Sequence, residues 1–172
     1  PFANAQTVGP FVRLAWEAIL AISQWMSARN AEALATVERG LALADETGAH
    51  LWDFMLAGQG VFAAATSGKT ETATAYLLRM NTSVSRGRRL DGVHYHFACF
   101  HEATRRGDRN KMREQADAGL ACAIEAGVLW GEAYTRPALA HSLFLEGDAE
   151  GARRELDAAM RIAQQIGCAN AR

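Results

Sequence analysis

The segment from Ala63 to Thr70 comes closest to a catalytic motif. It reads Ala-Ala-Ala-Thr-Ser-Gly-Lys-Thr, a phosphate-loop pattern with alanine in place of the first glycine. A working loop follows a strand and opens a helix, so that backbone amides cradle the phosphates. Here the preceding residues read as helix, and the acidic look-alike Asp45-Glu46 lies upstream instead of downstream. We interpret the segment as a turn, with nucleotide hydrolysis through Gly68, Lys69 and Thr70 as the enzymatic alternative.

The histidines have no metal-ligand spacing. His94 and His96 are two residues apart, so on a helix they point to nearly opposite sides. His94 and His101 share a face but are separated by about 10.5 Å along it, too far for one zinc ion. The cysteines, Cys99, Cys122 and Cys168, form no CxxC pair and favour free thiols in a reducing cytoplasm. We predict no metal and no cofactor.

Basic residues gather in the middle of the chain in two groups. They are Arg86, Arg88 and Arg89, then Arg105, Arg106, Arg109, Lys111 and Arg113. The groups fall at opposite ends of one expected helix, about 25 Å apart, with no aromatic residues interleaved for base stacking. The formal net charge is −1. We expect solvated charge and no direct contact with nucleic acid. Because no nucleophile has a base at a telling spacing, we also predict no catalytic residues.

Two ladders of turn residues divide the chain into repeats. One is Gly48, Gly87, Gly127 and Gly167, at intervals of 39, 40 and 40 residues; the other is Asn30, Gly68, Gly107 and Gly147, at intervals of 38, 39 and 40. Glycine after a helix supplies the left-handed residue that ends it, and the aspartates in Gly107-Asp108 and Gly147-Asp148 can cap the next helix.

Apolar residues between the turns recur at helical spacing, and the expected helices span residues 10–28, 31–47, 50–67, 70–85, 90–106, 109–126, 129–146 and 149–166. The small residues Gly40, Gly119 and Ala159 recur in register inside the second helix of three repeats. Glycine inside a helix costs about 1 kcal/mol relative to alanine, so we infer close helix–helix approach there. Pro137 lies inside the seventh helix and predicts either a kink or a helix that begins near it.

These elements predict an all-α fold, a right-handed superhelix of four antiparallel helix hairpins with a repeat of about 39–40 residues. The repeats would cover residues 10–48, 49–87, 88–127 and 128–167 of one domain spanning 1–172. The chain begins at Pro1 and ends where a further helix would start, so we expect a fragment of a longer protein. No signal peptide or membrane-spanning stretch is expected.

The small-residue spacing, including Ala140, Ala152 and Ala159, is similar to the tetratricopeptide pattern. The longer repeat and the phrases Gly40–Gly48, His50–Phe54, Val93–His96 and Glu146–Glu150 resemble the helical repeat region of the maltose-activator-like (MalT-like, LuxR-type) family of large bacterial transcriptional regulators. In that family such repeats usually follow an ATPase domain and can precede a DNA-binding domain. The resemblance covers roughly residues 10–167 and includes neither flanking domain.

The resemblance implies a cytoplasmic, non-catalytic module that senses a protein or small-molecule effector and relays its state. Register alone places the predicted groove residues on one face of two repeats: His94, Phe97, His101, Arg105, Tyr134, His141 and Phe144. The alternative is a stand-alone interaction scaffold or a self-associating adaptor, such as a homodimer, with no link to transcription. Neither reading involves a membrane.

Overall fold

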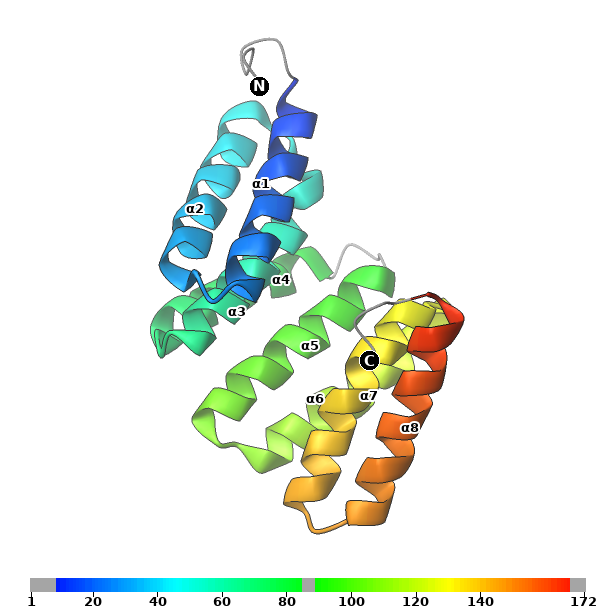
Figure 1. Cartoon of the computed structure of the whole chain (residues 1–172). Coiled ribbons are helices and arrows are strands. Elements are labelled where there is room, and N and C mark those ends of the chain that lie inside the picture. The colour runs from blue at the N-terminus through cyan, green and yellow to red at the C-terminus, as the bar shows by residue number, and fades with distance from the viewer. Residues whose placement is uncertain (1–8, 85–88, 168–172) are drawn as a thin grey trace. The chain divides into compact units, whose positions relative to one another are not determined.

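A computed structural model describes residues 9–84 and 89–167, and all regular structure in these ranges is helical (Figure 1). The all-α class is therefore confirmed. The elements are α1 (Pro10–Met26), α2 (Asn30–Thr47), the 3₁₀ helix η1 (His50–Trp52), α3 (Asp53–Thr66), α4 (Thr70–Val84), α5 (Arg89–Arg106), α6 (Arg109–Ala126), α7 (Leu129–Leu145) and α8 (Ala149–Gln165).

The helices form four hairpins in two compact units. One unit contains α1 to α4 and the other contains α5 to α8. Within each unit, the first helix of the second hairpin packs against both helices of the first hairpin: α3 contacts α1 and α2, and α7 contacts α5 and α6. The described helices include none that is long and apolar enough to cross a membrane.

Each unit has its own apolar core. In the first unit, Leu14 and Ala18 of α1 pack with Val37 and Leu41 of α2 and Leu56 of α3. In the second unit, the core brings α5 and α6 against α7. Its buried members are Phe100, Ala103, Met112, Ala116, Ala138 and Leu139. Both cores join three helices, so burial of apolar surface ties each hairpin to the next within its unit.

The predicted turn glycines adopt the left-handed conformation, with positive φ at Gly48, Gly68, Gly107, Gly127, Gly147 and Gly167. Gly87 lies outside the described residues. The prediction of Asn30 as the turn residue between α1 and α2 was wrong. Asn30 is the first residue of α2, and the left-handed residue of this turn is Ala28, with φ 58°. The corrected ladder is Ala28, Gly68, Gly107 and Gly147.

Two predicted helix caps are present. The Asp108 carboxylate accepts a hydrogen bond from the Lys111 amide at 3.0 Å, and the Asp148 carboxylate accepts one from the Gly151 amide at 2.8 Å. Each satisfies an amide that has no partner within its own helix. The turn before α2, where Arg29 stands in this place, has no side-chain cap.

The inferred close approach at the mid-helix glycines is also observed. A Cβ atom built at Gly40 would lie 2.9 Å from both Cδ atoms of Leu56 on α3. A Cβ atom at Gly119 would lie 3.2 Å from Cβ of His96 and 3.3 Å from Cγ2 of Thr135 on α7. A Cβ atom at Gly40 would require the Leu56 side chain to shift, and one at Gly119 would require its neighbours to give by a few tenths of an ångström.

The starts of α3 and α7 differ from one sequence expectation and decide between two others. The expected helix 50–67 is divided, since η1 precedes α3 at Asp53. In this tight turn His50 Nδ1 lies 3.1 Å from Asp53 Oδ2, because residues i and i+3 eclipse in a 3₁₀ helix. The helix α7 runs without a break from Leu129 through Pro137, so the alternative start near Pro137 is wrong.

Candidate functional site: an aromatic cleft between α5 and α7

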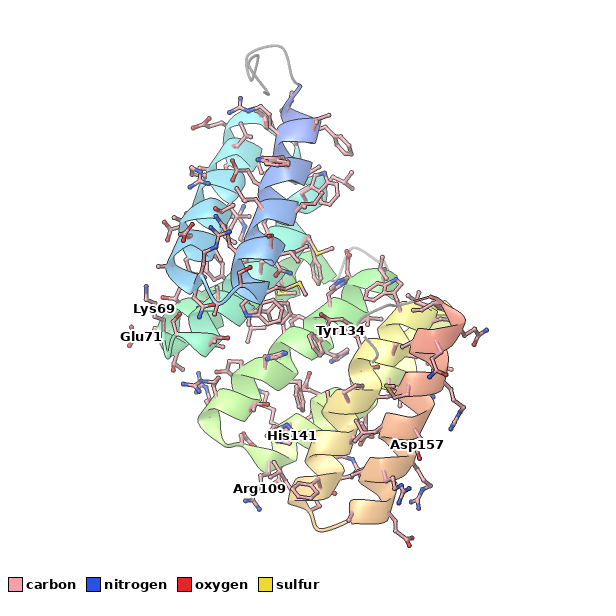
Figure 2. All side chains as sticks on the ribbon, in the orientation of Figure 1. Lys69, Glu71, Arg109, Tyr134, His141 and Asp157 are labelled. Atoms are coloured by element: carbon pink, nitrogen blue, oxygen red, sulfur yellow. The ribbon has the colours of Figure 1, made fainter. Side chains whose placement is uncertain are left out.

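An open cleft of about 390 Å³ lies between α5 and α7, within the second unit. The helix α5 contributes Phe97, Phe100 and His101, and α7 contributes Ala133, Tyr134, Pro137, Ala138 and His141. These residues recur at intervals of three and four on each helix, so they share a face. Figure 2 labels Tyr134 and His141 on the side of α7 that is turned toward α5.

The ring of Phe97 is at the centre of the aromatic wall. Its centroid lies 4.7 Å from that of His101 and 4.9 Å from that of Tyr134, and both contacts are edge-to-face. Phe100 lies 6.1 Å from His141 in a similar arrangement. Edge-to-face packing matches the positive ring edge with the negative ring face. The walls of the cleft are thus held together by ring contacts across the two helices.

His101 is uncharged at neutral pH. Burial lowers the pKa of its imidazole to about 4, because the surroundings disfavour the charged form. A neutral imidazole has one donor nitrogen and one acceptor nitrogen. Among the described residues that line the cleft, none carries a carboxylate, an amine or a guanidinium. The cleft therefore suits an uncharged, flat or apolar group.

Pro137 lies inside α7 and lines the cleft. It has no amide hydrogen, so it cannot donate the usual helical hydrogen bond to the carbonyl of Ala133 one turn earlier. Both residues line the cleft. The Ala133 carbonyl therefore lacks its usual helical hydrogen bond. The sequence pattern predicts a kink or a helix start at Pro137 and does not connect this residue with a site.

Four of the seven predicted groove residues meet in this cleft: Phe97, His101, Tyr134 and His141. The other three lie outside its lining. His94 is half-buried and packs on Trp130, with ring centroids 5.0 Å apart. Arg105 and Phe144 are exposed beyond the cleft, each about one helical turn past its histidine.

Phe100, Ala133, Pro137 and Ala138 were missed as lining residues. Phe100 follows Phe97 by three residues, and this spacing was a readable signal for a shared face. Ala133 and Ala138 are small and apolar, so nothing in their type distinguishes them from core alanines. The cleft exists where these two alanines leave room between larger rings.

The phosphate-loop look-alike is the predicted turn. Thr66 ends α3 and Thr70 begins α4. The amides of Ser67, Gly68 and Lys69 donate to the carbonyls of Ala63, Ala65 and Ala64 at 3.1, 3.1 and 2.9 Å, respectively. Amides that complete the end of α3 do not form a cradle for a phosphate.

Two cysteines are free thiols within the described part of the chain. Cys99 is buried and Cys122 is half-buried. Burial raises the pKa of both thiols, which keeps them protonated and poorly nucleophilic. Cys168 lies outside the described residues.

Two of the five members of the second basic group, Arg106 and Arg113, form ion pairs. Arg106 pairs with Glu102 one turn back on α5, and Arg113 pairs with Asp117 at 2.8 Å and Glu146 at 2.7 Å. In the first group, Arg86 and Arg88 fall outside the described residues. The paired arginines offer less free positive charge to a phosphate backbone than the sequence suggests.

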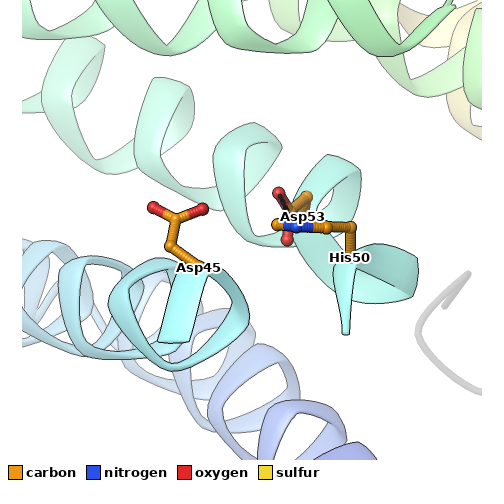
Figure 3. Close-up of side chains that lie close together, drawn as sticks. All are labelled: Asp45, His50 and Asp53. Carbon is orange, nitrogen blue, oxygen red and sulfur yellow. Dashed lines mark hydrogen bonds and ion pairs between the residues drawn. The ribbon is translucent and has the colours of Figure 1, made fainter. Parts of the chain in front are cut away.

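A second cluster of polar side chains lies in the first unit. Asp45, His50 and Asp53 place one ligand-type atom each within 4.8 Å of one another (Figure 3). Arg79 of α4 also belongs to this cluster, since its guanidinium donates to Asp45 Oδ1 and to Asp53 Oδ2, both at 2.9 Å. A cation would have to compete with this guanidinium. We interpret the cluster as an ion-pair network that joins η1 and the start of α3 to α2 and α4.

Comparison of the chain with protein-family models and with curated proteins finds no match. The function must therefore be argued from the α5–α7 cleft and the repeat.

Proposed function

We propose that this chain is a non-catalytic binding module and that the α5–α7 cleft receives an uncharged aromatic or apolar group of an effector. The observation that supports this most is the cleft itself. Its volume of about 390 Å³ falls within the usual size of small-ligand sites, and its walls are rings around a few polar atoms.

The walls indicate the chemistry of the ligand. Phe97 and Tyr134 present ring faces and edges on which a flat group can pack. The Tyr134 hydroxyl can orient a ligand by donating or accepting a hydrogen bond. A planar heteroaromatic metabolite or an aromatic side chain of a protein has this chemistry. A phosphorylated ligand does not, because the lining offers it no cationic partner.

The biological role that we propose is sensing and relay in a bacterial transcriptional regulator, following the resemblance to the MalT-like family. A ligand that bridges α5 and α7 would couple the first helices of two hairpins. Sequencing the parent reading frame tests this role. An ATPase domain upstream or a helix-turn-helix domain at either side would support it. A frame that lacks both would contradict it and favour a scaffold.

The cleft can be tested with indole, a flat probe that has one N–H donor. We expect indole to shift the amide resonances of α5 and α7 in a ¹H–¹⁵N NMR titration. Tyr134→Ala removes one wall and should weaken binding about threefold to tenfold. Ala133→Trp should fill the cleft and abolish binding.

Phe144→Ala is the matched control. Phe144 is an exposed ring on α7 outside the lining, so its loss should leave indole binding unchanged. Shifts confined to other helices, or equal losses in Tyr134→Ala and Phe144→Ala, would contradict the proposed site.

A further inference from the structure

The helix α1 has an apolar face on each side. Leu14, Ala18 and Ala21 are buried against α2 and α3. On the opposite side Trp16 exposes 55% of its surface and Ile19 exposes 57%, and this exposed stripe also contains Val12 and Met26. Intervals of three and four residues place the stripe on one face. A helix that is apolar on two sides is normally covered on both.

Repeat register identifies what covers this face elsewhere in the chain. Counted from the left-handed turn residue of each hairpin, Trp16 lies twelve positions before Ala28, and Leu56 lies twelve before Gly68. Leu56 is 0% exposed, because it packs into the core formed by α1 and α2. The stripe on α1 is therefore the face with which α3 packs on the hairpin before it.

The contact through which this face packs on the preceding hairpin occurs twice in the chain. Leu56 lies against Gly40, which is twelve positions after Ala28, and Thr135 lies against Gly119, which is twelve after Gly107. Each pair joins position +12 of one hairpin to position −12 of the next. The same contact therefore recurs once in each unit, with a small residue on the second helix of the first hairpin.

The last hairpin exposes the complementary face. Ala159 lies twelve positions after Gly147, in the place of Gly40 and Gly119. Beside it, Leu156 is 47% exposed and Met160 is 41% exposed. Their equivalents on α2, Val37 and Leu41, are 0% and 6% exposed because α3 covers them. The helix α8 thus exposes a surface on which a helix with the register of α1 can pack.

We propose that two copies of this chain associate head to tail, with the α1 stripe of one copy on α8 of the other and Trp16 placed over Ala159. The contact continues the packing that α3 makes on α2 and that α7 makes on α6. It is heterologous, so a pair of copies still exposes the α1 stripe of one copy and the α8 face of the other, and further copies can add. The proposal does not depend on a ligand in the α5–α7 cleft.

Sedimentation or light scattering of the full 172-residue chain tests the proposal. We expect the average mass to rise with concentration and to exceed that of a dimer. Ile19→Glu on α1 and Met160→Glu on α8 should each give a monomer. An equimolar mixture of these two variants should give a one-to-one dimer, because each retains the face that the other has lost.

Leu78→Glu is the matched control, since Leu78 is an exposed leucine on α4 that belongs to neither the α1 stripe nor the α8 face. It should associate like the unmodified chain. Circular dichroism verifies folding, and Trp16→Glu with Leu156→Glu provides a second pair of exposed positions. A chain that stays monomeric at every concentration overturns the proposal. So does a Met160→Glu variant that still dimerises, because that result indicates symmetric pairing through α1.

Discussion

Gly40 of α2 lies directly against Leu56 of α3, with no space for a Cβ atom between them. Leu56 is fully buried, so it cannot swing away without displacing its core neighbours. The glycine is thus explained by tertiary packing, against its own poor helix propensity. It sets how closely the second hairpin approaches the first.

Gly40→Ala should destabilise the chain. Alanine gains about 1 kcal/mol of helix propensity, but overpacking against Leu56 costs about 1–3 kcal/mol. We expect a net loss of about 1 kcal/mol in urea unfolding. Gly58→Ala on α3 is the control, because its Cβ atom would meet Met80 Cε at an ordinary 3.5 Å. This variant should be more stable than the unmodified chain, and a loss of stability in both variants would contradict the explanation.

Ala28→Gly should stabilise the chain. Ala28 has φ 58°, where the equivalent residues of the other three turns in this ladder are glycines. A left-handed residue with a Cβ atom costs about 1–2 kcal/mol, and glycine removes most of that cost. We expect a gain of about 1 kcal/mol, measured by chemical denaturation. The reciprocal change Gly107→Ala should lose a similar amount. An unchanged stability in Ala28→Gly would show that the turn is not strained.

The helices could be predicted from sequence because their boundaries are local. Glycines marked the ends, aspartates marked the caps, and the apolar period marked the faces, so most helix limits were within two residues of those observed. The turn at Ala28 was misassigned because no glycine marks it. The 3₁₀ turn was missed because Asp53 and His50 are held there partly through Arg79, a residue of another helix.

The site could be predicted only in part, because it depends on contacts between helices. Helical register put Phe97 and His101 on one face of α5 and Tyr134 and His141 on one face of α7. It could not show where the cleft ends. Arg105 and Phe144 continue these faces but lie beyond the lining, because the cleft depends on how the two helices pack. Packing is a tertiary property that spacing within one helix does not contain.

Lowering the pH should destabilise the second unit through His101. Its folded pKa of about 4 is below the ordinary value of about 6.5. Between these values the unfolded chain binds a proton and the folded chain does not, so the stabilising contribution is complete above about pH 6.5 and declines toward pH 4. The slope is at most about 1.4 kcal/mol per pH unit. Burial also lowers the pKa of His94, which acts in the same direction.

The effect of His101 protonation can be separated from that of the carboxylates by urea unfolding. The unmodified chain and His101→Gln are each measured at about pH 7.5 and about pH 5. The variant should lose less stability between the two pH values. His141→Gln is the matched control, because His141 is exposed in the same cleft, and it should retain the full loss. Identical losses in all three proteins would remove His101 as the cause.

Arg79 should determine whether the cluster in the first unit binds a metal ion. In the unmodified chain its guanidinium holds Asp45 and Asp53, so Zn²⁺ should not raise the melting temperature. Arg79→Ala leaves the largely buried Asp53 carboxylate without its cation, which should cost about 1–3 kcal/mol. Zinc should then restore part of this loss through Asp45, His50 and Asp53. The double variant Arg79→Ala/His50→Ala should show a weaker response. Equal stabilisation of the unmodified chain by zinc would mean that Arg79 does not block the site.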